Sequence, residues 1–338
     1  MITEIDQKSA KRNYLFDNFR AILIFLVVLG HMITDQLHNT IVIDTMYYFI
    51  FLFHMHAFIF ISGYFSKNVM KSRDTAVQSF LVPYVILNTA FWLQDKITHA
   101  DTAGPFRIFV TEWGLWFLLA MFVWKLFLKD LIRIRYILPI SFIVGIMSGL
   151  SEEFTMKMSL ARILSFLPFF LLGYFCNAAH INWLRKIPKR VTAFTLVVFI
   201  AISYLSVKYE IIKKEFLYMR KPFSTIDEEI LNSILIRSFV YIAAIIITIC
   251  FINLLSSRKS WLSIIGRNSI TIYIIHLFLV PYLRKLSWPW DETIYYSIYA
   301  IVIALSITYL FSRPIVLKIY NKIMNKITYL IMKPIPKV

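Results

Sequence analysis

The chain has 338 residues, of which 59% are hydrophobic and 16% are charged, and its formal net charge is +17. Soluble domains are closer to half apolar and one quarter charged, so this balance excludes an ordinary soluble enzyme and a disordered chain and favours a protein that lies mainly in lipid. The positive charge does not indicate nucleic-acid binding, because the basic residues stand between apolar runs rather than along one soluble face.

The N-terminus is polar. The stretch from Met1 to Asn18 precedes the first apolar run, and no small-residue cleavage site follows it. We therefore expect no cleavable signal peptide, and we expect the first span itself to direct insertion.

The apolar runs predict an all-α polytopic membrane protein. A helix needs about 20 apolar residues to cross a bilayer core. By that criterion we predict about ten transmembrane helices, although nine or eleven are also compatible, because some runs are short or carry polar groups. No repeat, low-complexity segment or soluble domain interrupts them, so residues 1–338 are treated as one domain with spans over about 19–312. The expected spans are 19–33, 45–65, 79–95, 108–128, 136–150, 159–178, 191–207, 232–254, 268–283 and 293–312.

Basic residues set the expected orientation. With the N-terminus inside, most Lys and Arg fall in cytoplasmic segments, as the positive-inside rule requires. Half of the outer basic residues fall in one long loop, 208–231, where that rule is weaker. We therefore expect both termini in the cytoplasm.

The tail, 313–338, is predicted to form an amphipathic helix. Lys318, Lys322 and Lys326 recur every four residues, and isoleucines follow each of them. Such a helix is typical of a segment that lies on an anionic inner leaflet. The two cysteines, Cys176 and Cys250, lie inside apolar runs, and we expect them to be packing residues rather than a disulfide or a metal site.

Charged groups inside spans are costly, and the first span carries two of the most informative residues. Arg20 and His31 are eleven residues apart, which is close to three whole turns. Both side chains therefore fall on one face, separated by roughly 16 Å. The alternative is structural: Arg20 reaches the inner headgroups and His31 caps the outer end of the helix.

The ninth and second spans carry further polar groups. In the ninth span Ser269 and His276 are close to two turns apart and share a face, just after Arg267 and Asn268. In the second span, Ser62 follows two histidines at positions 54 and 56. Neighbours two apart point to nearly opposite sides of a helix, so these histidines are not expected to bind one metal.

Arg162, in the sixth span, is expected to need a buried anion. The candidates are Glu112, Glu152, Glu153 or a ligand, and a structural salt bridge is as reasonable as a role in a site. Trp116 begins the apolar part of the fourth span.

Taken in order, these residues resemble the motifs of the membrane acyltransferase-3 family. The first span resembles the family's Arg-x10-His signature, and the second its Ser-Gly-Tyr motif. The fourth matches its Trp-Phe-Leu segment, and the ninth its late Gly-x-Asn-Ser to His element. Within the family, the motifs most resemble those of the fucose 4-O-acetylase-like branch, which acetylates sugars of bacterial surface polysaccharides. The residues concerned are Phe16–Arg20 with Gly30-His31, Ser62–Tyr64, Trp116–Leu118 and Gly266–His276.

The resemblance implies an O-acetyltransferase in the bacterial cytoplasmic membrane, with acetyl-CoA as cytoplasmic donor and a hydroxyl of a surface or lipid-linked sugar as acceptor. No metal is expected. Some family members carry an additional esterase-like domain, which is not expected here, so either the membrane core presents the acceptor itself or separate polysaccharide-assembly proteins do.

Roles can be assigned to the matching residues. Arg20 and His31 are the expected catalytic pair, with His31 acting as a general base or as a transient acyl carrier. Arg20, Arg267, Asn268 and Ser269 are expected at the donor. The residues expected at the acceptor are Ser62, Trp116, Arg162 and His276.

Two other functions fit a polar seam in a membrane. A transporter or flippase for a lipid-linked saccharide would also need one, but inverted repeats and Gly-broken helices are not evident here. A scaffold in polysaccharide export would not require polar residues to align on two helix faces. The outer segment 208–231 is expected to influence acceptor choice, unless it is an ordinary solvated loop.

Overall fold

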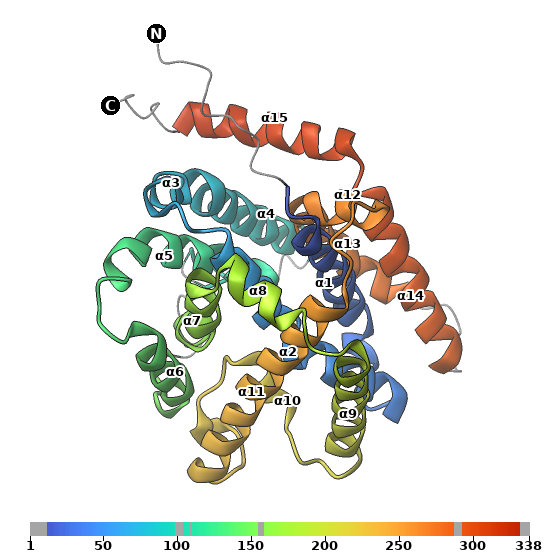
Figure 1. The fold of residues 1–338 in the computed structure, drawn as a ribbon. Helices are drawn as coiled ribbons and strands as arrows, with labels where there is room; N and C mark the ends of the chain where they lie inside the picture. The colour runs from blue at the N-terminus through green and yellow to red at the C-terminus, as the bar shows by residue number, and fades with distance from the viewer. Residues whose placement is uncertain are drawn as a thin grey trace.

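The computed structural model describes residues 12–98, 104–108, 110–111, 113–154, 159–286 and 293–331. Within these ranges the regular elements are helices, and no β-strand occurs among them. The helices pack into one bundle around two central ones (Figure 1).

The central helices are α1 (Tyr14–Ile33) and α2 (Ile41–Tyr64), joined through a short 3-10 turn at Thr34–Gln36. Both are apolar around much of their circumference, which is typical of helices surrounded by other helices. The hydroxyl of Thr40 caps the start of α2 by accepting from the amide of Ile43.

Two helices pack closely against α2. One is α7 (Leu160–Phe175), which crosses α2 where Gly63 faces the backbone of Phe170 and Gly173 faces that of Phe60. A methyl group at either glycine would overlap a backbone carbonyl of the other helix, so the crossing requires glycine on both sides. The other is α11 (Ile230–Leu254).

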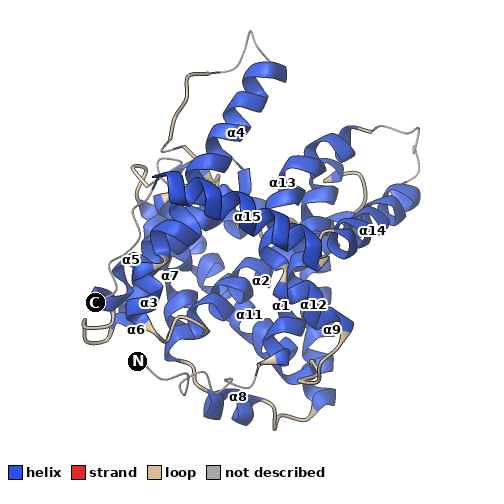
Figure 2. Ribbon diagram, turned by 90° about the horizontal axis from the view of Figure 1, so that it is seen from above, coloured by secondary structure: helices blue, strands red, loops and turns tan. Residues whose placement is uncertain are grey.

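The remaining helices surround this centre. They are α3 (Val69–Asp74), α4 (Val82–Thr98), α5 (Trp116–Leu131), α6 (Ile137–Met147), α8 (Ala178–Leu184), α9 (Lys189–Lys208), α10 (Lys214–Tyr218), α12 (Trp261–Arg267), α13 (Ser269–Lys285), α14 (Thr293–Leu310) and α15 (Pro314–Ile331). Seen from above, α1 and α2 lie near the middle and α15 crosses the bundle (Figure 2).

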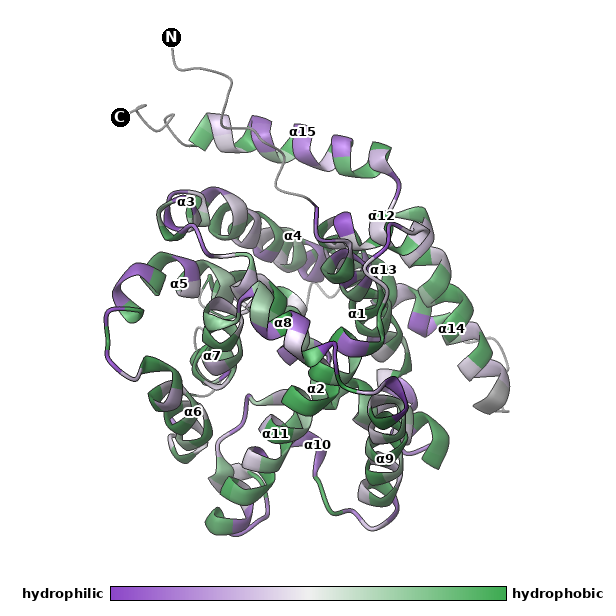
Figure 3. Cartoon of the chain, in the orientation of Figure 1, coloured by the Kyte–Doolittle hydropathy of each residue, from purple (hydrophilic) through white to green (hydrophobic). Residues whose placement is uncertain are grey.

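Several outer helices present apolar side chains to their surroundings. On α9, Phe194 is 68% exposed and Val197 is 61% exposed. Most residues of the bundle helices are hydrophobic, whereas hydrophilic residues concentrate at helix ends, in loops and along α15 (Figure 3). Continuous apolar exposure of this kind is unfavourable in water and fits contact with lipid tails. The protein is a polytopic membrane protein.

Each of the ten expected spans contains a helix, but length and composition support fewer crossings. Four helices, α1, α2, α9 and α11, are long and apolar enough to span a membrane by themselves. Three bent pairs raise the number to as many as seven, with bends of 98° at α7–α8, 70° at α12–α13 and 67° at α14–α15. The helices α4, α5 and α6 are shorter, with 17, 16 and 11 residues. A total near ten, and the cytoplasmic position of both termini, therefore remain predictions.

The predicted tail helix is present as α15. Ile315, Ile319 and Ile323 form an exposed apolar stripe along it, and Lys318 and Lys322 lie beside a cavity against α12. The two cysteines are unpaired: Cys250 is buried in α11, and Cys176 lies at the end of α7.

Candidate active site

Two adjoining cavities run along α1. The His31 cavity has a volume of about 300 Å³, and the Arg20 cavity has a volume of about 170 Å³. Both are lined by Val27, Met55 and Tyr273, so these three side chains form the junction between them. Both predicted residues therefore lie in neighbouring cavities along one face of α1, which meet at Val27, Met55 and Tyr273.

Three helices supply polar groups to both cavities. The helix α1 places Arg20 in one and His31 in the other, as their spacing predicts. Along α2, Ser62 lines the Arg20 cavity and His54 lines the His31 cavity. Along α13, Ser269 lines the Arg20 cavity and Arg284 lines the His31 cavity, with Tyr273 between them.

The imidazole of His31 has aromatic and imidazole rings as neighbours. Its ring centre is 5.3 Å from that of His276, and Phe51 lies edge-on at 6.4 Å. His276 is fully buried, and its Nδ1 lies 3.2 Å from the carbonyl oxygen of Ile272. A carbonyl accepts only from a protonated nitrogen, so the Nε2 of neutral His276 carries a lone pair. That Nε2 has no hydrogen-bond partner in the described part of the chain.

His54 and His56 point to different sides of α2, as predicted. His54 Nδ1 lies 2.7 Å from the carbonyl of Ile50, and its ring lies beside Phe51 in the His31 cavity. His56 is fully buried against α7, where its ring lies 4.7 Å from that of Phe166. The two histidines therefore do not converge on one ion.

Arg20 contacts both a carboxylate and the face of an aromatic ring. Its Nη1 lies 3.6 Å from Asp17 Oδ1, and its guanidinium carbon lies 4.6 Å from the ring centre of Phe65. Asp17 also accepts from Arg12 Nε at 2.6 Å. One buried carboxylate thus faces two arginines, which leaves positive charge at this end of α1 for an anionic group.

Trp116 and Arg162 lie together in the His31 cavity. The Arg162 guanidinium carbon is 5.0 Å from the Trp116 ring centre, and Arg162 Nε donates to the carbonyl of Tyr218 at 3.3 Å. Of the anions considered for Arg162, Glu152 and Glu153 form no salt bridge with it among the described residues, and Glu152 accepts from Ser224 Oγ at 2.7 Å. Glu112 lies outside the described residues.

Arg267 and Asn268, expected at the donor together with Arg20, line a third cavity. This Arg267 cavity has a volume of about 790 Å³ and lies among the start of α1, α12 and α15. The 70° bend between α12 and α13 separates Arg267 from Ser269, which explains the division. The amide of Asn268 donates to the carbonyl of Ser312, so this side chain ties α13 to the end of α14. The basic residues lining the cavity are Arg12, Lys259, Arg267, Lys318 and Lys322.

Gly266 explains why α12 lies so close to α1. A Cβ at this position would overlap the backbone carbonyl of Asp17. Asn18 completes the contact, since its amide donates to the carbonyls of Ser256 and Arg258 and its oxygen accepts from Ser260 and Ser263. These two motif residues therefore assemble the scaffold on which Arg20 stands.

The sequence reading missed three arginine or aspartate side chains. Arg284 Nη1 contacts Asp35 at 3.0 Å and donates to the backbone carbonyl of His31 at 3.3 Å. Arg237 is 1% exposed in α11 and points its Nη1 at the end of α6, near Ser148 Oγ at 3.3 Å. A lone Arg inside an apolar run was a visible signal for Arg237, whereas Arg284 and Asp35 become neighbours only in the fold.

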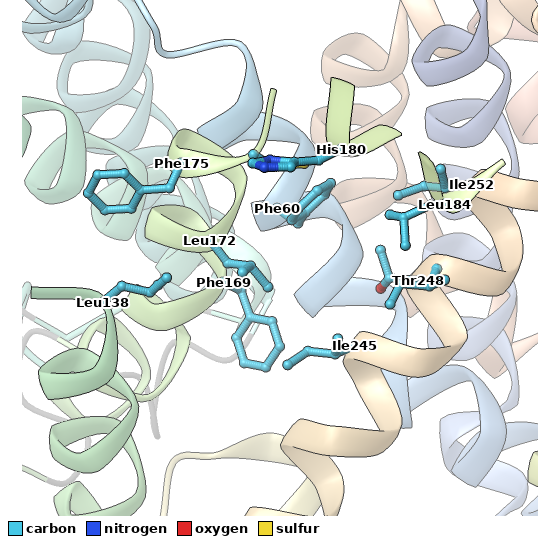
Figure 4. Close-up of a pocket in the computed structure, with 12 residues that line it drawn as sticks. Phe60, Leu138, Phe169, Leu172, Phe175, His180, Leu184, Ile245, Thr248 and Ile252 are labelled. Carbon is cyan, nitrogen blue, oxygen red and sulfur yellow. The ribbon is translucent and has the colours of Figure 1, made fainter. Parts of the chain in front are cut away.

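A fourth cavity is of a different kind. It lies between α7 and α11, is lined by side chains such as Phe169 and Ile245, and has His180 of α8 at one end (Figure 4). Its described lining contains no Lys, Arg, Asp or Glu, so it lacks the charged groups that the three cavities above share.

Comparison with known proteins identifies the family. A family model described as "Acyltransferase domain" matches residues 13–313. Nodulation protein NolL of Sinorhizobium fredii is 32% identical over 183 residues, covering 48% of each chain, so this chain spans about half the length of that curated relative. No solved structure matches. The family match covers all the motif residues from Phe16 to His276, and the chain belongs to the membrane acyltransferase-3 family, as those motifs predict.

Proposed function

We propose that the protein is an integral-membrane O-acyltransferase that moves an acetyl group from cytoplasmic acetyl-CoA to a hydroxyl of a cell-surface or lipid-linked sugar. The observation that carries this proposal is the junction at Val27, Met55 and Tyr273, which joins a cavity containing Arg20 to a cavity containing His31. A donor and an acceptor entering from opposite sides would meet there. The family match supports the acyl-transfer chemistry.

The donor is assigned to the basic side. Acetyl-CoA carries several phosphates, and the Arg267 cavity combines five basic side chains with no acid among its described lining residues. In this proposal Arg267 and its neighbours bind the nucleotide phosphates. Arg20 and Ser269 then guide the pantetheine arm toward the junction.

The acceptor is assigned to the His31 cavity. His31 takes the proton from the attacking hydroxyl, whose oxygen forms the new bond to the acetyl carbonyl carbon. The carbon–sulfur bond of the thioester breaks, and the coenzyme A thiolate takes the proton back from the imidazolium. In the alternative order, His31 carries the acetyl group briefly before the hydroxyl accepts it. His276 orients His31, Trp116 and Arg162 bind the acceptor, and Ser62 helps to orient the reacting groups.

The test uses membrane vesicles permeabilised with detergent, so that radiolabelled acetyl-CoA and a crude glycan fraction of the host reach both faces of the protein. Wild-type vesicles are expected to label the glycan, and His31→Ala vesicles with equal protein content are expected to label it at least about a hundredfold more slowly, since general bases contribute about that much. His180→Ala is a matched control, because His180 lies on α8 outside the three charged cavities. Full activity in His31→Ala would refute the proposed role of His31.

A transporter or flippase for a lipid-linked saccharide is the second candidate. The break between α12 and α13 favours it, because discontinuous helices beside polar cavities are typical of transporters. Purified protein in detergent distinguishes the two, since acetyl transfer does not need two compartments whereas transport does. Acetylated glycan formed in detergent would exclude a purely transporting role.

The proposal also includes a cellular location, a branch of the family and partners for the protein. It assigns the chain to the bacterial cytoplasmic membrane and to the fucose 4-O-acetylase-like branch, with membrane lipids and polysaccharide-assembly proteins as partners. The exposed isoleucine stripe of α15 supports contact with a leaflet surface.

A further inference from the structure

The His31 cavity holds more positive charge than its own acids neutralise. Arg162, Arg220 and Arg284 line it, and Asp35 is the one carboxylate among its described lining residues. Asp35 pairs with Arg284 at 3.0 Å. In the described part of the chain, no salt bridge joins Arg162 or Arg220 to a carboxylate. Two guanidinium groups therefore remain without an anion in a cavity where a sugar is expected.

Both guanidinium groups lie beside Tyr218, at the end of the short helix α10. The carbonyl of Tyr218, at the end of α10, accepts from Arg162 Nε, and the ring of Tyr218 lies 5.5 Å from the Arg220 guanidinium carbon. The phenol of Tyr218 bonds in turn to the phenol of Tyr47 on α2. The ring of Trp116 supports the other side of Arg162. These contacts hold Arg162 in place with respect to α1, where His31 lies, while Arg220 is exposed beside Tyr218.

The terminal amino groups of Arg162 remain available. Its contacts use Nε and the face of the guanidinium, and no protein group within the described residues accepts from Nη1 or Nη2. A planar guanidinium binds carboxylate and phosphate oxygens through two parallel hydrogen bonds, and its preference for them rises where water is limited. A neutral sugar would leave the partly buried Arg162 uncompensated, which is unfavourable, whereas Arg220 is exposed and adds its charge at the same cavity.

We propose that the acceptor is an anionic glycan, and that Arg162 and Arg220 bind its carboxylate or phosphate while the hydroxyl to be acetylated lies at His31. This inference rests on the acetyl transfer proposed above. Its consequence is selectivity: the enzyme acetylates a sugar that carries, or is linked to, an oxyanion. The segment 208–231 thereby sets acceptor choice, through Tyr218 and Arg220.

The experiment separates labelled products by charge. Wild-type protein in detergent-permeabilised vesicles is supplied with radiolabelled acetyl-CoA and the host glycan fraction, and the labelled glycan is passed over an anion exchanger. Label in the retained fraction is the expected result. Label confined to the neutral fraction would overturn the anionic-acceptor inference while leaving acetyl transfer intact, and no label in either fraction would contradict the proposed function itself.

Two treatments of the retained glycan identify the oxyanion. Carbodiimide-activated reduction converts carboxylates to alcohols, so label that then passes the column came from an acidic sugar. Phosphodiester cleavage by mild acid, releasing label from the column, indicates a phosphate-linked acceptor.

Variants then test the two arginines with the retained glycan as acceptor. Arg220→Gln and Arg162→Gln are expected to raise the KM for the glycan by about tenfold to a hundredfold, because each removes a charge-assisted contact, and to leave the KM for acetyl-CoA unchanged. Lys208→Gln is the matched control, since Lys208 lies on α9 away from the lining of this cavity. A higher KM for acetyl-CoA with an unchanged KM for the glycan would overturn the inference and assign these arginines to the donor.

Discussion

At the scale of single residues, Arg20 differs from an ordinary arginine at a membrane surface. It shares Asp17 with Arg12, lies over the ring of Phe65, and keeps its side chain 25% exposed in the cavity. The planar guanidinium suits all three contacts, because it can stack on a ring while its edges meet oxygen atoms. An ammonium group at the same place would keep the charge but lose that geometry.

Arg20→Lys is therefore expected to raise the KM for acetyl-CoA by about tenfold, the usual effect of losing one charge-assisted contact. The measurement is the acetyl-CoA dependence of the initial rate in vesicles. Arg73→Lys, on the exposed surface of α3, should show no change. An unchanged KM in Arg20→Lys would argue against donor binding by this residue.

The residues of the candidate site were predictable only in part. Arg20 and His31 follow from helical periodicity, because both lie on one continuous helix. Arg220 and Arg284 could not be found in that way, since they reach the His31 cavity from a loop and from the far end of α13. The sequence also left four candidate anions for Arg162, since a long-range partner depends on the tertiary fold rather than on local spacing.

At the scale of helices, the glycine in the Ser-Gly-Tyr motif has a packing explanation. Gly63 and Gly173 face the backbones of the opposite helices, which lets α2 and α7 touch. Lys67, just after α2, closes the same crossing by donating to the last carbonyls of α7, among them that of Cys176 at 2.6 Å. Burial lowers the pKa of Lys67.

Gly173→Ala is expected to destabilise the protein by about 1–3 kcal/mol, the usual cost of forcing an extra methyl group into a packed contact. The loss should appear as a lower midpoint of thermal unfolding in detergent. Gly104→Ala is the control, because nothing lies within 4 Å of a Cβ at that position. Equal midpoints for both variants would show that the α2–α7 crossing is looser than the structure indicates.

Helix positions were more predictable than helix breaks. Each apolar run contains a helix because burial of such a run without backbone hydrogen bonds is too costly. The breaks after α7 and between α12 and α13 fall where local polar caps, such as Asn177 accepting from His180, compete with continuation. The sequence did not single out these caps, so α8 and α12 were not expected as separate helices.

At the scale of the whole molecule, the bundle has a direction. His31 lies near the end of α1 that leads to Asp35 and the outer segment, and Arg20 lies toward the end that meets α12 and α15. The predicted orientation assigns the first end to the outside and the second to the cytoplasm. Donor and acceptor would then approach from the sides on which each is expected.

Cysteine labelling in intact cells tests that orientation. In a background without Cys176 and Cys250, Thr225→Cys is expected to react with a membrane-impermeant maleimide added outside, and Ser257→Cys only after the cells are permeabilised. Both positions are exposed in the structure. The reverse pattern would contradict the inside position of the N-terminus and the assignment of the cavities to sides.

The central claim is that the Arg20 and His31 cavities form one transfer path, and the initial rate of acetyl transfer by purified protein tests it most directly. Val27 is 2% exposed and lines both cavities at their junction, so Val27→Trp should fill the passage and Val27→Ala should leave it open. We predict that Val27→Trp, shown to be monodisperse and to bind acetyl-CoA normally, transfers acetyl groups at least about a hundredfold more slowly, as expected when reacting groups cannot meet. Val27→Ala should stay within about threefold of the wild type, because it removes bulk without touching a polar group. A wild-type rate in Val27→Trp would contradict the path through this junction.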